Sequence, residues 1–242
     1  MMRIAFLMEG ASTGRLSGEL ARRERVLREI ASPGTEIDIF GLEQDPEKSH
    51  LGTVQSSYAA ALSTIGDLKC AIAAEEAGYR AVIIPCGGDP GIAPLREVLT
   101  IPVVPPGSAA KHMCSLIGPR FSIITVGNGP VKRPEIHERD GLMKLVSIHQ
   151  TGLTVPDVRV KPSEAFEAMV KEGKIAVDVY GAASVTFGCM SMGFLMVDEQ
   201  LSEEIGVPVV NPVKAAVKTA ETLIDLGLTH SKRAYPIPPS LR

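Results

Sequence analysis

The stretch Ile101-Pro-Val-Val-Pro-Pro-Gly-Ser-Ala-Ala110 decides the fold, because it returns later in the chain as Val207-Pro-Val-Val-Asn-Pro-Val-Lys-Ala-Ala216. Each copy has the pattern of a short buried strand that runs into a helix rich in alanine. Upstream of each copy lies an apolar strand that ends in a cysteine, Cys86 before the first copy and Cys189 before the second. Strand, cysteine loop, helix, strand and helix therefore occur twice in the same order, which predicts an internal duplication.

Short apolar runs that end in Gly or Pro alternate with longer helical stretches. In the first half the expected strands are Arg3–Met8, Glu36–Phe40 and Ala81–Pro85, and the expected helices are Leu16–Ala31 and Tyr58–Ala77. The second half continues the alternation with apolar runs at Phe121–Val126 and Ala183–Phe187. This pattern is typical of β-α-β units around a mostly parallel sheet.

The duplication and the alternation together predict an α/β protein made of two similar lobes. Each lobe is expected to hold a mostly parallel four- to five-stranded sheet flanked by helices, and a pseudo-two-fold axis would relate the lobes across a cleft that holds the active site. We expect residues 1–103 and 213–242 to form the first lobe and residues 104–212 the second. The apolar stripe from Val213 to Leu226 has the pattern of a helix packed on a sheet.

Composition and charge exclude several classes of protein. Hydrophobic residues make up 45% of the chain and charged residues 22%, which is typical of a globular protein with a buried core. The formal net charge of -3, without long runs of one sign, argues against nucleic acid or an anionic membrane as partner and favours a small molecule. The apolar run Ile4–Met8 is too short for a signal peptide or a membrane span, which predicts a cytoplasmic protein.

The cysteines divide into two kinds by their surroundings. None belongs to a Cys-x-x-Cys pair or has a His-x-x-x-His partner, so we expect thiols and no structural metal. Cys70 and Cys114 lie inside helical stretches and are expected in the core. Cys86 and Cys189 each follow a strand and have a glycine as neighbour, Gly87 or Gly188, which is the setting of a reactive thiol at a ligand-binding edge.

Cys86 lies in the run Val82-Ile-Ile-Pro-Cys-Gly-Gly-Asp-Pro-Gly91, where a buried strand breaks into a glycine loop. Gly87 and Gly88 let the backbone approach a substrate and turn N–H groups toward it. Asp89-Pro90 has the pattern of a helix N-cap and first helical position. A helix amino terminus and nearby donors lower the pKa of a thiol, so we expect a thiolate to form readily here.

Cys189 has a comparable setting in Ser184-Val-Thr-Phe-Gly-Cys-Met-Ser-Met-Gly193, a strand followed by a turn of small residues. The sequence predicts a helix from about Met192 to Ile205 after that turn. Gly188 and Met190 flank the thiol and are candidate ligand contacts. Thr125 ends the strand that opens the second half, so its hydroxyl is a candidate for the same site.

Two cysteines on opposite sides of one carbon can invert a stereocentre without a cofactor. One removes the proton as a thiolate while the other delivers a proton to the opposite face as a thiol. Each such acid or base typically supplies on the order of 10²- to 10⁴-fold. Donors that stabilise the enolate-like intermediate must supply the rest. The residues therefore predict a cofactor-independent racemase or epimerase that acts on a carbon acid next to a carbonyl.

The chain resembles the aspartate/glutamate racemase superfamily, and within it the hydantoin racemase branch that includes allantoin racemases. The resemblance covers nearly the whole chain and is most specific at Cys86-Gly-Gly-Asp-Pro-Gly91, Gly188-Cys189, the Gly-Val-Pro-Val-Val stretch from Gly206, and Leu226-Gly-Leu-Thr-His-Ser-Lys232. It implies the two-lobe fold, the two-cysteine mechanism without cofactor or metal, and a homo-oligomer. A 5-substituted hydantoin or allantoin is the substrate it favours.

The chain departs from the family's pattern at the ligand loops. The family commonly has Asn-Pro-Asn-Thr after its first strand, where this chain has Glu9-Gly-Ala-Ser-Thr13. Ser12 and Thr13 still offer hydroxyl donors. The Glu9 carboxylate would repel a dicarboxylate but could accept N–H bonds from a cyclic ureide. The second loop reads Cys-Met-Ser-Met instead of the common Cys-Ala-Gly-Met, which leaves the substrate open.

Other functions stay open at this point. The same scaffold could carry aspartate or glutamate racemisation, maleate cis-trans isomerisation or decarboxylation of an arylmalonate, although the resemblance implies one cysteine fewer in the decarboxylases. A non-catalytic module that binds a small molecule is the more distant alternative. Among the histidines, His112, His137 and His149 have no partner that the sequence identifies, so surface or packing roles are expected.

Overall fold

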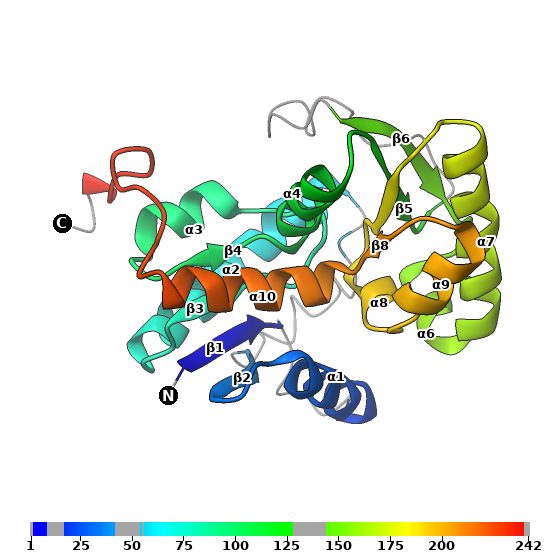
Figure 1. Cartoon of the computed structure of the whole chain (residues 1–242). Helices are drawn as coiled ribbons and strands as arrows, with labels where there is room; N and C mark the ends of the chain where they lie inside the picture. Colours follow the sequence, from blue (N-terminus) through cyan, green and yellow to red (C-terminus); the bar gives the residue numbers. More distant parts are fainter. Residues whose placement is uncertain (1, 9–16, 42–53, 55, 128–143, 240–242) are drawn as a thin grey trace. The chain divides into compact units, whose positions relative to one another are not determined.

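The computed structural model of the chain describes residues 2–8, 17–41, 54, 56–127 and 144–239. The chain forms two compact units (Figure 1). Unit 1 consists of Met1–Pro105 and Ala216–Arg242, and unit 2 consists of Pro106–Ala215. The chain therefore crosses from one unit to the other immediately before the helix that follows the first Pro-Val-Val stretch, and returns within the helix that follows the second.

Unit 1 holds a parallel sheet of four strands in the order β2-β1-β3-β4. Its elements are β1 (Met2–Leu7), α1 (Ser17–Ile30), β2 (Thr35–Phe40), α2 (Ser57–Glu76), β3 (Ala81–Ile83), α3 (Ile92–Val98), β4 (Val103–Val104) and most of α10 (Pro212–Asp225). Parallel neighbours require crossover connections, and the helices between the strands supply them.

Unit 2 repeats this plan with a parallel sheet in the order β6-β5-β7-β8. Its elements are α4 (Pro106–Ile117), β5 (Phe121–Thr125), β6 (Leu145–Gln150), α6 (Val155–Val160), α7 (Pro162–Asp178), β7 (Ser184–Phe187), α8 (Met190–Gly193), α9 (Asp198–Ile205) and β8 (Val209–Val210). Two parallel four-stranded sheets flanked by helices confirm the predicted α/β fold class.

The hydrogen-bond registers of the two sheets match at the repeated Pro-Val-Val stretches. Val82 of β3 pairs with Val103 of β4 in unit 1, and Val185 of β7 pairs with Val209 of β8 in unit 2. Val103 and Val209 occupy the same place in the repeated stretch. The internal duplication seen in the sequence is therefore also a duplication of strand pairing.

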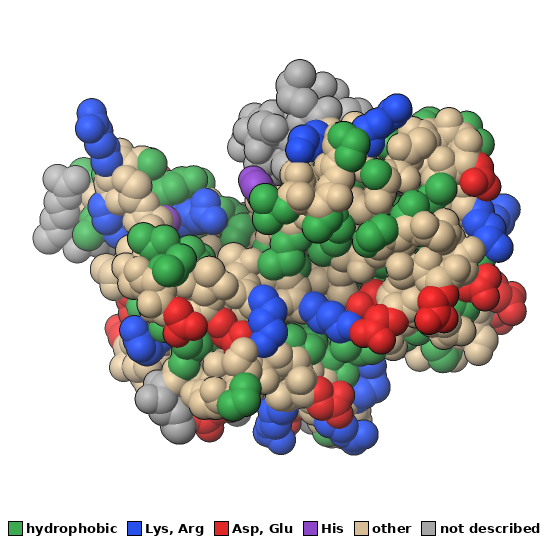
Figure 2. Space-filling view, viewed as in Figure 1, with side chains coloured by type: hydrophobic (Ala, Val, Ile, Leu, Met, Phe, Trp, Pro, Cys, Tyr) green, Lys and Arg blue, Asp and Glu red, His purple; other side chains and the backbone are tan. Residues whose placement is uncertain are grey.

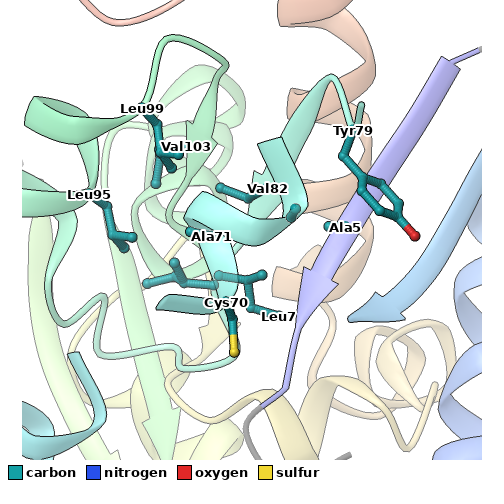
Figure 3. Close-up of a cluster of buried hydrophobic side chains, with 11 residues drawn as sticks. Ala5, Leu7, Cys70, Ala71, Tyr79, Val82, Leu95, Leu99 and Val103 are labelled. Carbon is teal, nitrogen blue, oxygen red and sulfur yellow. The ribbon is translucent and has the colours of Figure 1, made fainter. Parts of the chain in front are cut away.

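One apolar cluster of unit 1 lies between its central strands and the helices α2 and α3. Figure 3 shows side chains from β1, β3 and these helices meeting in one apolar cluster. Leu7, Val82 and Leu95 are fully buried there, and burying a side chain of this size contributes about 1.5–3 kcal/mol. Cys70 of α2 belongs to the cluster, with 3% of its surface exposed.

Cys114 is also a buried cysteine on a helix, in unit 2. It lies on α4, which packs on β5, β7 and β8, and its side chain is fully buried against Phe121 and Ile123. Its thiol donates a weak hydrogen bond to the carbonyl oxygen of Val185 at 3.9 Å. The predictions that Cys70 and Cys114 are core residues are both confirmed.

The carboxyl-terminal segment closes the end of α3. The Lys232 ammonium donates hydrogen bonds to the carbonyl oxygens of Arg96, Glu97 and Leu99 at 2.8, 2.9 and 2.5 Å. These carbonyls lie at a helix end, where the negative end of the helix dipole favours a cation. A residue of the segment 226–232, singled out by its resemblance to the family, thus supports the helix that follows the Cys86 loop.

No helix among the described residues has the length and apolar character needed to cross a lipid bilayer. On the face drawn in Figure 2, acidic and basic side chains of the described residues lie interspersed. This mixture agrees with the small formal net charge of -3.

Glu221 of α10 ties that helix to the turn between α1 and β2. Its carboxylate accepts hydrogen bonds from the Ser32 N–H at 2.7 Å, the Ser32 hydroxyl at 2.9 Å and the Lys218 ammonium at 2.9 Å. Burial alone would raise the pKa of this carboxyl, but the bonds from Ser32 and Lys218 outweigh it and hold the pKa below its usual 4.5. The native state therefore favours the ionised form.

We predict that Glu221→Gln lowers the free energy of unfolding by about 1–3 kcal/mol near neutral pH. The contribution of a carboxyl whose pKa is depressed by folding is complete above the unfolded-state pKa and disappears as the pH falls through the folded-state pKa. The stability gap between wild type and variant should therefore stay constant at neutral pH and close only as the pH falls through the depressed folded-state pKa, below the usual 4.5. Urea unfolding across a pH series measures it.

Glu204→Gln is the matched control for this experiment, because the Glu204 side chain is 50% exposed and its ion pair with Lys174 spans 3.8 Å. An exposed pair contributes little. A Glu221→Gln gap that persisted undiminished in strong acid would contradict the assignment of the effect to the ionised carboxylate.

Candidate functional site

Cys86 and Cys189 occupy equivalent positions in the two sheets. Cys86 lies four residues after Val82, and Cys189 lies four residues after Val185. Val82 and Val185 each pair with the first valine of a Pro-Val-Val stretch. Each cysteine therefore sits just beyond the carboxyl end of a central parallel strand, which is the edge where α/β sheets bind ligands.

The Cys86 loop turns twice before α3 begins. The Asp89 N–H donates to the Cys86 carbonyl oxygen at 3.1 Å, and Asp89 and Gly91 have φ angles of 51° and 71°. The prediction that Asp89-Pro90 forms the N-cap and first position of the helix is wrong, because Gly91 is the N-cap and makes no side-chain capping bond. Two residues with positive φ carry the chain through the turn, so the helix starts later than the local pattern indicates.

Gly91 allows this loop to rest on α2. A Cβ atom at Gly91 would lie 2.5 Å from Cγ2 and 2.9 Å from Oγ1 of Thr64. The Thr64 hydroxyl is itself held by a hydrogen bond of 2.8 Å to the carbonyl oxygen of Ala60. The backbone after Cys86 is therefore packed directly against a fixed side chain of the neighbouring helix.

The predicted ligand contacts of the first loop lie close to the thiol. A Cβ atom at Gly88 would lie 3.7 Å from the Cys86 sulfur, and Gly88 is exposed. Gly87 and Cys86 are partly buried. A thiol beside an exposed glycine is accessible to a small molecule.

The Cys189 loop begins where β7 ends. Cys189 is the N-cap of α8, with φ -130° and ψ 128°, and its carbonyl oxygen accepts hydrogen bonds from the Met192 and Gly193 N–H groups at 3.1 and 3.3 Å. The prediction of one helix from Met192 to Ile205 is wrong, because α8 and α9 are separate. Met196 has a φ of 57°, which interrupts helical backbone between them.

Thr125 and Gly188 pack together beside Cys189. A Cβ atom at Gly188 would lie 2.8 Å from both Cβ and Oγ1 of Thr125, so only a glycine fits without movement. The Gly188 N–H donates to the Ile124 carbonyl oxygen at 2.8 Å. Met190, with 3% of its surface exposed, packs into the interior. Unit 2 thus brings the predicted residues Thr125, Gly188, Cys189 and Met190 together.

Three predicted site residues, Glu9, Ser12 and Thr13, lie outside the described residues, as does His137. Within the described part of the chain, no group of three or more His, Cys, Asp or Glu side chains is placed to hold a metal ion. Any inference about function therefore rests on the geometry of the two cysteine loops.

His149 is buried and has a packing role, one of the two roles expected from the sequence, with partners that the sequence did not identify. Its Nδ1 lies 3.3 Å from the Glu172 carboxylate and its Nε2 lies 2.8 Å from the Ser147 hydroxyl. That hydroxyl in turn lies 2.6 Å from the hydroxyl of Ser122 on the adjacent strand. The network joins β5, β6 and α7 in the interior, which is a packing role. Glu172 comes from a helix 23 residues away in sequence, too far for a local pattern to reveal it.

Comparison with known proteins agrees with this geometry. A model of the Asp/Glu/Hydantoin racemase family matches residues 21–220. The chain is 34% identical to a hydantoin racemase from Pseudomonas sp. (strain NS671) over 218 residues, which covers 89% of this chain and 85% of that protein.

Two solved allantoin racemases have the same fold over nearly their whole length. The enzyme from Klebsiella pneumoniae superposes with a TM-score of 0.83 at 27% identity, covering 98% of this chain and 94% of that one. The enzyme from Pseudomonas fluorescens superposes with a TM-score of 0.81 at 32% identity, covering 98% and 97%. The similarity therefore includes both units.

We predict that iodoacetamide labels Cys86 and Cys189 of the folded protein well before Cys70 and Cys114. The first two thiols are partly buried and the other two are buried. Burial also raises the pKa of the Cys114 thiol to about 11, so its reactive thiolate is scarce. Mass spectrometry of the peptides gives the four rates. In urea all four should react alike, and early labelling of Cys70 or Cys114 in the folded protein would contradict the prediction.

We also predict that Gly188→Ala shifts the Cys189 loop, because the new methyl group must push Thr125 aside. Overpacking of this kind costs about 1–3 kcal/mol of stability. The labelling rate of Cys189 should change while that of Cys86 does not. Gly18→Ala is the control, since a Cβ atom at Gly18 in α1 meets nothing within 4 Å. Equal Cys189 rates in both variants would show that the Thr125 contact is unimportant.

Proposed function

Because this chain belongs to the Asp/Glu/hydantoin racemase family and is a racemase, we propose that it inverts a 5-substituted hydantoin or allantoin with Cys86 and Cys189 as a paired acid and base. The observation that carries the proposal is the matched placement of the two thiols, each four residues beyond a strand residue paired with the repeated Pro-Val-Val stretch. The names of the similar proteins, hydantoin racemase and allantoin racemase, support the substrate class.

In the proposed reaction one cysteine removes the proton from the carbon next to the ring carbonyl. The other donates a proton to the opposite face, and for the mirror-image substrate the two exchange roles. A thiol titrates at roughly 8.5 in model compounds, so a thiolate and a thiol can coexist near neutral pH. Repulsion between two thiolates would keep one of them protonated, and the pair would titrate as one coupled unit.

Backbone N–H groups of the glycine loop after Cys86 would stabilise the enolate-like intermediate. Gly87 and Gly88 carry no side chain that would keep a substrate away from the backbone, and donors aimed at a developing negative charge are among the strongest contributions to catalysis. The Thr125 hydroxyl, packed against Gly188, is a further donor for the substrate. The chemistry then needs neither metal nor cofactor.

Glu9, Ser12 and Thr13 complete the proposed substrate contacts. A neutral cyclic ureide offers N–H groups that the Glu9 carboxylate would accept, whereas a dicarboxylate would be repelled. Ser12 and Thr13 would donate hydroxyl hydrogen bonds to ring carbonyls. The preference for a hydantoin over aspartate or glutamate rests on this charge.

The experiment that tests the proposal follows exchange at the chiral carbon by NMR in deuterated water, with a panel of 5-substituted hydantoins and allantoin. We predict that Cys86→Ser and Cys189→Ser each reduce racemisation by about 10²-fold or more. Each variant keeps one working base, so it should retain exchange of one enantiomer only, and the retained enantiomer should differ between the two.

Cys70→Ala is the matched control, because it removes a buried thiol from the core and leaves both loops intact. It should racemise at nearly the wild-type rate once its folding is confirmed. A short thiol-to-thiol cross-linker should also join Cys86 to Cys189. Full racemisation by either serine variant would disprove two-base catalysis.

A further inference from the structure

We infer that Asn211 is a positioning residue for Cys189, which it holds in place through the short helix α8. The inference rests on the proposed role of Cys189 in catalysis. Asn211 follows β8 directly and precedes α10, and only 3% of its surface is exposed.

Asn211 bonds to three different parts of unit 2. Its Nδ2 donates to the Gly193 carbonyl oxygen at 2.9 Å and to Asp198 Oδ1 at 2.9 Å, and its Oδ1 accepts from the Val213 N–H at 2.9 Å. The first bond reaches the last residue of α8, the second the first residue of α9, and the third the first turn of α10. One buried amide therefore bonds to the end of α8, to the start of α9 and to the backbone two residues after it.

The bond to Gly193 bears directly on Cys189. Helix α8 has four residues, with Cys189 as its N-cap and Gly193 as its last residue. A helix this short has no stability of its own in water, because nucleation is unfavourable and few bonds follow. Its position, and with it that of the Cys189 backbone, depends on contacts with the rest of unit 2, which are the burial of its own side chains and the hydrogen bond from Asn211.

The Asp198 carboxylate fixes the orientation of the Asn211 amide. Asp198 has 7% of its side chain exposed, and its Oδ2 accepts a hydrogen bond of 2.7 Å from the Lys214 ammonium while its Oδ1 faces Asn211. A buried carboxylate requires donors, so it turns the NH₂ group of Asn211 toward itself and Gly193. The amide oxygen then points to Val213.

Gly193 is the residue that lets Asn211 come close enough. A Cβ atom at position 193 would lie 2.9 Å from both Asn211 Oδ1 and Val213 Cγ2. The residue of the first repeat that corresponds to Asn211 is Pro105, which has no side-chain donor. Position 105 therefore cannot supply the first repeat with the bond that Asn211 makes in the second.

The decisive variant is Asn211→Asp, which has the same shape. It keeps the oxygen that accepts from Val213 but replaces the group that donates to Gly193 and Asp198 with an oxygen. We expect α8 to loosen, so that the iodoacetamide rate of Cys189 relative to Cys86 in the same molecule rises about tenfold. We expect kcat for racemisation to fall about tenfold or more, with KM changed less than about threefold. A rate ratio within twofold of wild type, or below it, would overturn the inference.

A double variant separates the bond to Gly193 from the general stability of the region. Asp198→Asn combined with Asn211→Asp restores a donor and acceptor pair between positions 198 and 211 but gives the Gly193 carbonyl no partner. The urea midpoint should recover while the Cys189 labelling ratio and kcat stay at their altered values. Recovery of all three would overturn the inference, because the pair with Asp198 would then be sufficient.

Two further variants keep the test interpretable. Gly193→Ala pushes α8 away from Asn211 and should reproduce the altered labelling ratio, so the result does not depend on whether Asn211→Asp folds. Glu221→Gln replaces a buried carboxylate of unit 1 with a neutral amide and should leave the ratio unchanged. If Cys189→Ser racemises normally, the proposed function fails, but the labelling ratio still tests the Asn211 contact on its own.

Discussion

Parallel pairing of the central strands is the constraint on which the rest of this protein depends. When β1 and β3 run in the same direction, a crossover must return the chain across a face of the sheet, and helices cover both faces. All strands then end at the same edge. The same holds for β5 and β7, so the loop after each central strand reaches a ligand-binding edge for purely topological reasons.

The two units meet this constraint with different local contacts. After Cys86 the chain passes through two residues with left-handed backbone, packs against Thr64 of α2 and enters α3. Lys232 donates hydrogen bonds to the carbonyl oxygens at the end of α3. After Cys189 the chain enters a single helical turn, which Asn211 holds. The duplicated strands have kept the same register, whereas the contacts that support the two cysteine loops differ.

Buried polar groups give the architecture its specificity. Glu221 selects the contact of α10 with the turn at Ser32, and Asp198 selects the orientation of Asn211. Each is a carboxylate with little exposed surface, and each is compensated by a lysine, Lys218 or Lys214. A buried hydrogen bond contributes little net stability, but a buried carboxylate that loses its partner destabilises the protein strongly. These contacts therefore discriminate against alternative packing.

The sequence by itself determined the features that depend on residues close together in the chain. Apolar runs at β1, β3, β5 and β7 predicted a parallel α/β fold, because a strand buried on both faces must be apolar throughout. The repeated Pro-Val-Val stretches predicted the duplication and singled out Cys86 and Cys189. The helical surroundings of Cys70 and Cys114 predicted their burial. Each of these inferences uses residues that are neighbours in the chain.

Only the tertiary structure decided the features that depend on distant residues. The start of α3 at Gly91 rests on left-handed backbone packed against Thr64, and the break between α8 and α9 rests on Met196. The partner of His149 is on α7, and Asn211 meets α8 across the end of the sheet. Local periodicity carries no information about which distant group will satisfy a buried donor, because that choice is made when the whole unit packs.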